Sequence, residues 1–183
     1  PPGFAPKVER LSWGRQNWFP WWAEEHRAAR EGVILMDMSF MSKFRVEGRD
    51  AGRVLNHISA NEVDGPAGMI TYTPWLNERG KLEADLTVTK LDDERFFVVV
   101  TDTMHRHAET WMRRHIPDDA HAFVADVTSG YCQINVQGPK SRALLQTHPG
   151  FDHDAERPLG AEPQAVGIRS AAGAGQAPRL DDP

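Results

Sequence analysis

The alternation of apolar and polar residues predicts several strands in the first 140 residues. Residues 43–46 and 82–91 alternate in the way that half-buried strands do. Residues 69–73 and 96–101 are rich in β-branched and aromatic residues, and the second run is apolar enough for a buried strand. A further strand is expected at residues 131–136. Because three of these strands follow one another closely, they predict a mostly antiparallel sheet.

Four segments show the apolar spacing of helices. They are residues 21–34, ending near Gly32, residues 51–58, with Asp50 as N-cap, residues 104–115, stopped by Pro117, and residues 139–146. The order of these elements favours an α+β fold in which the helices pack on one face of the sheet.

Changes in composition and periodicity along the sequence divide the chain into three parts. Residues 1–20 form an aromatic N-terminal arm without clear periodicity, and residues 21–150 are expected to form one domain. Residues 151–183 are dominated by Ala, Gly and Pro, so this tail has too little apolar surface to offset the entropy of ordering it. The tail is therefore expected to be irregular.

Composition restricts the partners that the chain can have. Its net charge of -5 gives no electrostatic reason to expect nucleic acid or an anionic membrane, and no apolar run is long enough to cross a bilayer. A single cysteine cannot form an intrachain disulfide, so a cytoplasmic location is expected, or the mitochondrial matrix if the protein is eukaryotic. The expected partner is a small molecule.

The histidine, cysteine, lysine and arginine residues considered next are expected to have structural roles. His105 and His107 fall on a predicted helix, where residues two apart point in different directions, so no metal site is expected. Cys132 has no Cys-x-x-Cys partner and is expected to be a small core residue. Lys140 and Arg142 fit a solvated helix face. The chain also lacks the Gly-x-Gly-x-x-Gly element that would bind FAD.

Residues 72–88, which read YTPWLNERGKLEADLTV, resemble the hairpin of the glycine-cleavage T-protein (aminomethyltransferase) superfamily. Upstream matches in the expected order support this resemblance: Asp37-Met38-Ser39, Lys43, Val46, Gly48, Asp50-Ala51 and Gly68. The aromatic segment at residues 13–19 and the segment at residues 126–139 are similar to the branch fused to flavin-dependent dimethylglycine and sarcosine dehydrogenases. The resemblance runs from about residue 11 to residue 147.

This resemblance implies a site for tetrahydrofolate. Asp85 would be the catalytic carboxylate beside the pterin nitrogens, where it would stabilise cationic one-carbon species and relay a proton. Tyr72 would contact the pterin, and Met41, Leu55 and Val88 would supply apolar walls. From the residues alone, a salt bridge for Asp85 and a core position for Tyr72 stay open.

The function implied is one-carbon transfer in a dimethylglycine or sarcosine dehydrogenase-like, FAD-dependent oxidoreductase, with FAD held by a flavin domain upstream. The family domain continues past the position of Gln146 with a Gly-Glu-x-Gly motif and an arginine, and neither is found here. The chain is therefore expected to be a C-terminally incomplete, inactive fragment that binds folate weakly, its tail arising from truncation or a frameshift. Lys81 also replaces a second glycine of the hairpin.

Three alternatives stay open at this point. One is a non-catalytic folate-binding assembly module of the same superfamily, and another is a folate-dependent demethylase. The third is a scaffold that binds a partner through its sheet edge and its aromatic arm.

Overall fold

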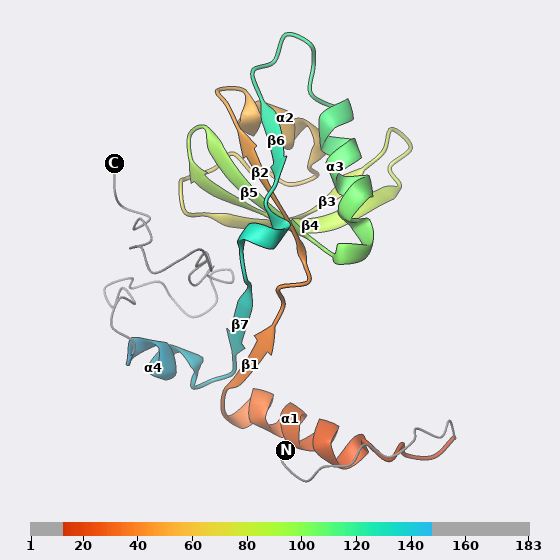
Figure 1. Ribbon diagram of the computed structural model, residues 1–183, viewed down its shortest axis with the longest axis vertical. Coiled ribbons are helices and arrows are strands. Elements are labelled where there is room, and N and C mark those ends of the chain that lie inside the picture. The colour runs from red at the N-terminus through yellow and green to blue at the C-terminus, as the bar shows by residue number, and fades with distance from the viewer. Residues whose placement is uncertain (1–12, 148–183) are drawn as a thin grey trace. The chain divides into compact units, whose positions relative to one another are not determined.

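A five-stranded sheet with the strand order β3-β4-β5-β2-β6 organises residues 37–134 of this computed structural model (Figure 1). The structure describes residues 13–147. The strands are β2 (Ser42–Glu47), β3 (Ile70–Leu76), β4 (Leu82–Asp92), β5 (Arg95–Val100) and β6 (Phe123–Asp126). All pairings between neighbouring strands are antiparallel, which confirms the predicted sheet type.

Two helices, α2 (Ala51–Ile58) and α3 (His105–Arg114), pack against this sheet, and the short 3-10 helix η1 (Asp102–Met104) leads into α3. Both helices share one apolar core with alternate residues of the strands, so they cover the same face, as the α+β prediction requires. Representative core residues are Phe44, Val46, Val88, Phe96 and Val98 from the strands and Ala51, Leu55, Ala108 and Met112 from the helices. The opposite face of the sheet, called the outer face below, carries the other residues of each strand.

The turn between β2 and α2 depends on Gly48 and Asp50. Gly48 has a φ of 127°, and an added Cβ would overlap the carbonyl oxygen of His121. Helix α2 begins after Asp50 as predicted, but the side-chain cap expected from Asp50 is absent. The Asp50 carboxylate instead accepts a hydrogen bond from the His121 backbone N–H at 2.8 Å and forms an ion pair with Arg53. The cap prediction was wrong because a distant loop competes for the carboxylate.

A second, smaller unit contains the described residues 13–36 and 135–147. Its helices are α1 (Phe19–Glu31) and α4 (Ser141–Gln146), and its two-stranded sheet pairs β1 (Ile34–Asp37) with β7 (Ile134–Gln137) (Figure 1). Gly138, at a φ of 122°, lies so close to Gly32 that an added Cβ would overlap the Gly32 carbonyl oxygen. The Lys140 N–H also donates to that oxygen at 3.2 Å.

Several predicted boundaries were wrong. The first helix begins at Phe19, two residues earlier than expected, although its end at Glu31 confirms the predicted end near Gly32. Strand β1, which follows it, was not expected. Strand β6 was also missed, and the strand expected at residues 131–136 begins only at Ile134. The described residues divide into two compact units, and the expected single domain at residues 21–150 stays a prediction. The tail at residues 151–183 lies outside the described residues.

Side-chain exposure corrects one further expectation. Cys132 was expected in the core but is exposed. Lys140 and Arg142 are exposed, as a solvated helix face requires. None of the helices between residues 13 and 147 combines the length and the apolar content needed to span a bilayer.

Candidate functional site

The outer face of the sheet carries Asp85, the carboxylate that the family resemblance predicts to be catalytic. Along β4, Ala84, Leu86 and Val88 are buried, while Asp85 is exposed. Because successive residues of a strand point to opposite faces, Asp85 and Thr87 point away from helices α2 and α3. Asp85 therefore lies on the open side of the sheet.

Tyr72 of β3 and Asp85 of β4 contact each other directly. Tyr72 is paired with Thr87, and Asp85 with Pro74, so Tyr72 and Asp85 are diagonal neighbours on one face. The Tyr72 hydroxyl donates a hydrogen bond to Asp85 Oδ2 at 2.9 Å. Tyr72 remains 58% exposed, so its ring is available to a ligand. The structure thus brings together two of the five predicted site residues.

The Tyr72–Asp85 contact also fixes the protonation of the phenol. The hydrogen bond to Asp85, together with the negative charge of that carboxylate, raises the pKa of Tyr72 above its ordinary value. Tyr72 therefore stays a neutral donor through the physiological pH range. Its hydroxyl orients the carboxylate, which can accept hydrogen bonds from a ligand carrying N–H groups.

Tyr72 belongs to a row of residues that crosses four strands on the outer face. Tyr72 is paired with Thr87, Thr87 with Val99, and Val99 with Lys43. Neighbouring strands lie about 4.8 Å apart, so this row is about 14 Å long. One end of the row is the exposed Tyr72, and the other is Lys43 at the start of β2.

Met41 lies beside the Lys43 end of this row. The Lys43 ammonium donates to the Met41 carbonyl oxygen at 2.7 Å and to the Ser39 carbonyl oxygen at 3.0 Å. Lys43 is 1% exposed, and burial lowers the pKa of its ammonium, with Asp37 acting in the opposite direction. Met41 and the Tyr72–Asp85 pair therefore occupy separate ends of one face.

Leu55 and Val88 do not reach the outer face. Both are 0% exposed and belong to the core between the sheet and the helices. Val88 points away from Asp85 because three positions separate them along a regular strand. Their predicted role as walls of the site is therefore corrected to a role in the core.

The hairpin between β3 and β4 accommodates Lys81 in place of the expected glycine. Gly80 takes the positive φ of 69°, and the N–H of Lys81 donates to Asn77 Oδ1 at 3.0 Å. The amide of Asn77 also donates to Glu83 Oε1 at 2.7 Å, and Glu83 contacts His107 Nε2 of α3 at 3.0 Å. These contacts hold the end of the hairpin that leads to Asp85.

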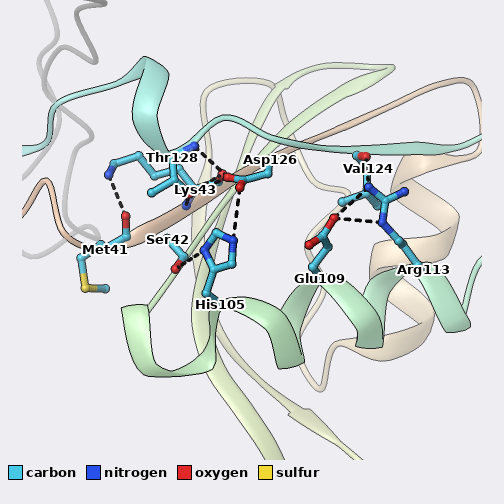
Figure 2. Close-up of polar contacts among 9 residues, drawn as sticks. All are labelled: Met41, Ser42, Lys43, His105, Glu109, Arg113, Val124, Asp126 and Thr128. Atoms are coloured by element: carbon cyan, nitrogen blue, oxygen red, sulfur yellow. Dashed lines mark hydrogen bonds and ion pairs between the residues drawn. The ribbon is translucent and has the colours of Figure 1, made fainter.

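Sequence reasoning missed a second polar cluster, shown in Figure 2, which joins Ser42, His105, Asp126 and Thr128. His105 was considered only as part of an H-x-H pair, and it contacts Asp126 and Ser42 whereas His107 contacts Glu83. No local motif signals the cluster, because its members come from three separate segments of the chain. Among residues 13–147, no three His, Cys, Asp or Glu side chains gather as a metal site would require.

Comparison with known proteins identifies the family of this chain. The model of the GCVT N-terminal domain family matches residues 3–161, which extends beyond residue 147, where the resemblance was expected to end. A 4-methylaminobutanoate oxidase (formaldehyde-forming) of Paenarthrobacter nicotinovorans is 41% identical over 79% of this chain and 17% of its own length. The mitochondrial pyruvate dehydrogenase phosphatase regulatory subunit of Mus musculus is 30% identical over 72% of this chain and 15% of its own length.

The solved structures give the same relationship. The aminomethyltransferase T of the glycine cleavage system from Bartonella henselae superimposes with a TM-score of 0.63 and 25% identity, over 69% of this chain and 35% of that chain. The chain thus spans less than a fifth of the two relatives named above. The shared antiparallel sheet and the match over residues 3–161 show that the chain belongs to the GCVT N-terminal domain family, and is related to aminomethyltransferases and to oxidases of methylamino compounds.

Proposed function

We propose that this chain supplies a tetrahydrofolate-binding surface for one-carbon transfer in an FAD-dependent oxidase of N-methylated amines, of the dimethylglycine or sarcosine dehydrogenase kind. The observation that carries the proposal is the hydrogen-bonded pair of Tyr72 and Asp85 on the outer face of the sheet. The chain's membership of the GCVT N-terminal domain family supports it. The relative whose name includes "formaldehyde-forming" supports an oxidised methyl group as the source of the one-carbon unit.

The residues on the outer face suit a reduced pterin. Tyr72 offers a flat and exposed ring for stacking, and Asp85 offers carboxylate oxygens that accept hydrogen bonds from the N–H groups of a pterin edge. Bound folate would supply the nucleophilic nitrogen that captures the one-carbon unit. Asp85 would stabilise the positive charge that develops during capture, and its carboxylate could accept the proton that the nitrogen releases.

The flavin chemistry is assigned to a different part of the protein. The oxidase relative is much longer than the segment that this chain matches, since the match covers 17% of it. The chain carries no Gly-x-Gly-x-x-Gly element for the pyrophosphate of FAD. FAD is therefore proposed to bind to a flavin domain of the parent protein, which is the macromolecular partner of this domain.

A non-catalytic use of the same surface is the second candidate. It is favoured by the relative that is named as a regulatory subunit, which is 30% identical to this chain. In that case folate binding would require Asp85 but no one-carbon transfer would follow. An assay of the parent protein with sarcosine, dimethylglycine and other methylated donors separates the two candidates and identifies the donor.

Ligand-observed NMR tests the proposed binding, since saturation transfer from protein to ligand detects weak complexes. The 183-residue chain is mixed with tetrahydrofolate under reducing, anaerobic conditions, alongside Asp85→Asn and the matched control Asp93→Asn. Asp93 lies in the turn after β4 with its side chain 98% exposed, so its substitution makes the same change in charge outside the proposed site.

The wild-type chain should transfer saturation to the pterin protons. Loss of a charged acceptor should weaken binding about tenfold in the Asp85 variant, while the Asp93 variant should bind as the wild type does. Equal affinities for the wild type and the Asp85 variant, or no transfer to the wild type, would refute the proposal.

A further inference from the structure

His105, the first residue of α3, contacts two strands at once (Figure 2). Its Nδ1 lies 2.9 Å from Ser42 Oγ of β2, and its Nε2 lies 3.2 Å from Asp126 Oδ2 of β6. The ring also packs on Phe44 with a centroid distance of 5.2 Å. Both ring nitrogens are therefore engaged by side chains from different strands.

Thr128 closes these contacts into a ring. Its hydroxyl donates to Asp126 Oδ1 at 2.6 Å and lies within hydrogen-bonding distance of the Lys43 backbone, whose N–H donates to it at 3.0 Å. The path from Ser42 through His105, Asp126 and Thr128 thus returns to the residue next to Ser42. We call these four residues, together with Lys43, the His105 network.

The order serine, histidine, aspartate is also that of a hydrolase triad, but Ser42 is 1% exposed. A substrate could not reach its hydroxyl. The network therefore serves to place residues and not to attack a substrate.

Ser42 connects the network to the outer face. It points to the same side as Phe44, toward the helices, whereas its neighbours Met41 and Lys43 lie at the end of the row that begins at Tyr72. Lys43 in turn holds the Met41 carbonyl oxygen through its ammonium. A shift of Ser42 would therefore displace one end of the outer-face row.

A second contact between α3 and β6 offers an internal comparison. Arg113, near the other end of α3, donates to the Val124 carbonyl oxygen at 2.9 Å and pairs with Glu109 (Figure 2). This contact joins the same helix to the same strand as His105 does. Among the hydrogen bonds described for Arg113, none goes to a side chain of β2.

We propose that His105 is a positioning residue for the folate surface: through its hydrogen bond to Ser42 it fixes the Met41–Lys43 end of the outer-face row. This inference rests on the proposed function for its effect on folate. Its structural part, the dependence of the Met41–Lys43 backbone on His105, can be measured without ligand.

The test compares four variants of the 183-residue chain. A Gln side chain at position 105 can place its amide nitrogen where Nε2 lies, so His105→Gln keeps the contact with Asp126 and loses the one with Ser42. An Asn side chain can place its amide nitrogen near Nδ1, so His105→Asn keeps the contact with Ser42 and loses the one with Asp126. His105→Gln and Ser42→Ala therefore remove the contact in question, His105→Asn keeps it, and Arg113→Met removes the comparison contact. Hydrogen exchange of peptides covering residues 40–44 is followed by mass spectrometry, with urea unfolding to give the overall stability of each variant.

Exchange at residues 40–44 should accelerate about tenfold in His105→Gln and in Ser42→Ala, beyond what their loss of global stability produces. It should stay near the wild-type rate in His105→Asn and in Arg113→Met once stability is matched. In the saturation-transfer assay, the first two variants should also bind tetrahydrofolate about fivefold more weakly than the last two.

Two results would overturn the inference. One is equal acceleration in His105→Gln and Arg113→Met, which would make His105 a general stabiliser of α3. The other is an unchanged exchange rate in both His105→Gln and Ser42→Ala. A wild-type chain that binds no folate would refute the proposed function instead, and the exchange rates would still decide whether His105 positions residues 41–43.

Discussion

The Tyr72 hydroxyl donates a 2.9 Å hydrogen bond to Asp85 on the sheet face that α2 and α3 leave uncovered. The two residues meet because an antiparallel pairing places residues of β3 and β4 diagonally across from each other. An exposed aromatic ring that holds a carboxylate has little to contribute to the core. It is a suitable arrangement for recognising a flat ligand with N–H groups.

The titration of Tyr72 reports directly on this contact. Because Asp85 stabilises the protonated phenol, Tyr72 should ionise at higher pH than a free tyrosine. The raised pKa means that its contribution to stability is present below the ordinary tyrosine pKa and is lost as pH rises through the raised one. Difference absorbance spectra of the wild type and Tyr72→Phe isolate the transition. In Asp85→Asn the midpoint should fall toward the ordinary value, and an unchanged midpoint would contradict the contact.

Substitutions at Thr87 and Val88, which are adjacent in β4 but point to opposite faces, should affect folate binding and folding stability separately. Val88→Thr places a hydroxyl in the core and should lower the free energy of unfolding by about 1–3 kcal/mol, leaving the folate affinity of the folded chain unchanged. Thr87→Val makes the reverse isosteric change on the outer face. It should alter stability by no more than about 0.5 kcal/mol but weaken binding. Urea unfolding and saturation transfer measure the two quantities, and a binding defect confined to Val88→Thr would restore Val88 to the site.

Gly48 and Gly68 should respond differently to alanine. Both have positive φ, but a Cβ at Gly48 would overlap the His121 carbonyl oxygen, whereas a Cβ at Gly68 meets no atom within 4 Å. Gly68→Ala should cost about 1 kcal/mol for the backbone conformation alone. Gly48→Ala should cost at least about 3 kcal/mol, since backbone atoms must also move. Urea unfolding at 25 °C gives both values, and similar losses would indicate that the β2–α2 turn adapts.

Asp126 should contribute to the loss of stability in acid. Burial acts to raise the pKa of Asp126, but hydrogen bonds from Thr128 and the nearby His105 outweigh it and lower that pKa. A lowered pKa stabilises the folded state above the ordinary aspartate value and loses this effect as pH falls through the lowered value. The effect is modest because the side chain is 42% exposed. Unfolding free energies from about pH 5 to about pH 2 should therefore depend less on pH in Asp126→Asn than in the wild type.

The exposed Asp118, in the loop after α3, provides the control for this measurement. Asp118→Asn should keep the pH dependence of the wild type. If both variants flatten the curve equally, the acid sensitivity does not originate at Asp126.

Local patterns predicted the elements that local contacts define. The alternation in β4 and the turn at Gly80 identify the hairpin that carries Tyr72 and Asp85, and the apolar spacing after Asp50 identifies α2. These features involve residues near one another in sequence. Their periodicity is therefore visible without knowledge of the fold.

Elements that depend on distant partners were missed. Strand β6 has one buried residue, Val124, and exists because it pairs with β2 some eighty residues earlier. Strand β1 was not predicted, because it has only four residues and exists through its pairing with β7, whose residues follow about a hundred positions later in the sequence. Local propensity does not contain this information.

The candidate site shows the same division. Family motifs identified Tyr72 and Asp85, and the structure places them in contact. Val88 was assigned to the same surface because it lies near Asp85 in sequence, although an odd separation along a strand puts it on the other face. Leu55 belongs to a helix on that other face as well, and the His105 network requires three segments that only the fold brings together.

The most direct measurement is a map of backbone amide shifts in a nitrogen-proton NMR spectrum of the 183-residue chain during titration with tetrahydrofolate. The largest changes are expected in β3 and β4 around Tyr72, Asp85 and Thr87, and only small changes in α2 and α3. A spectrum that does not change, or one whose changes concentrate on the helix-covered side of the sheet, would contradict the claim that the outer face binds folate.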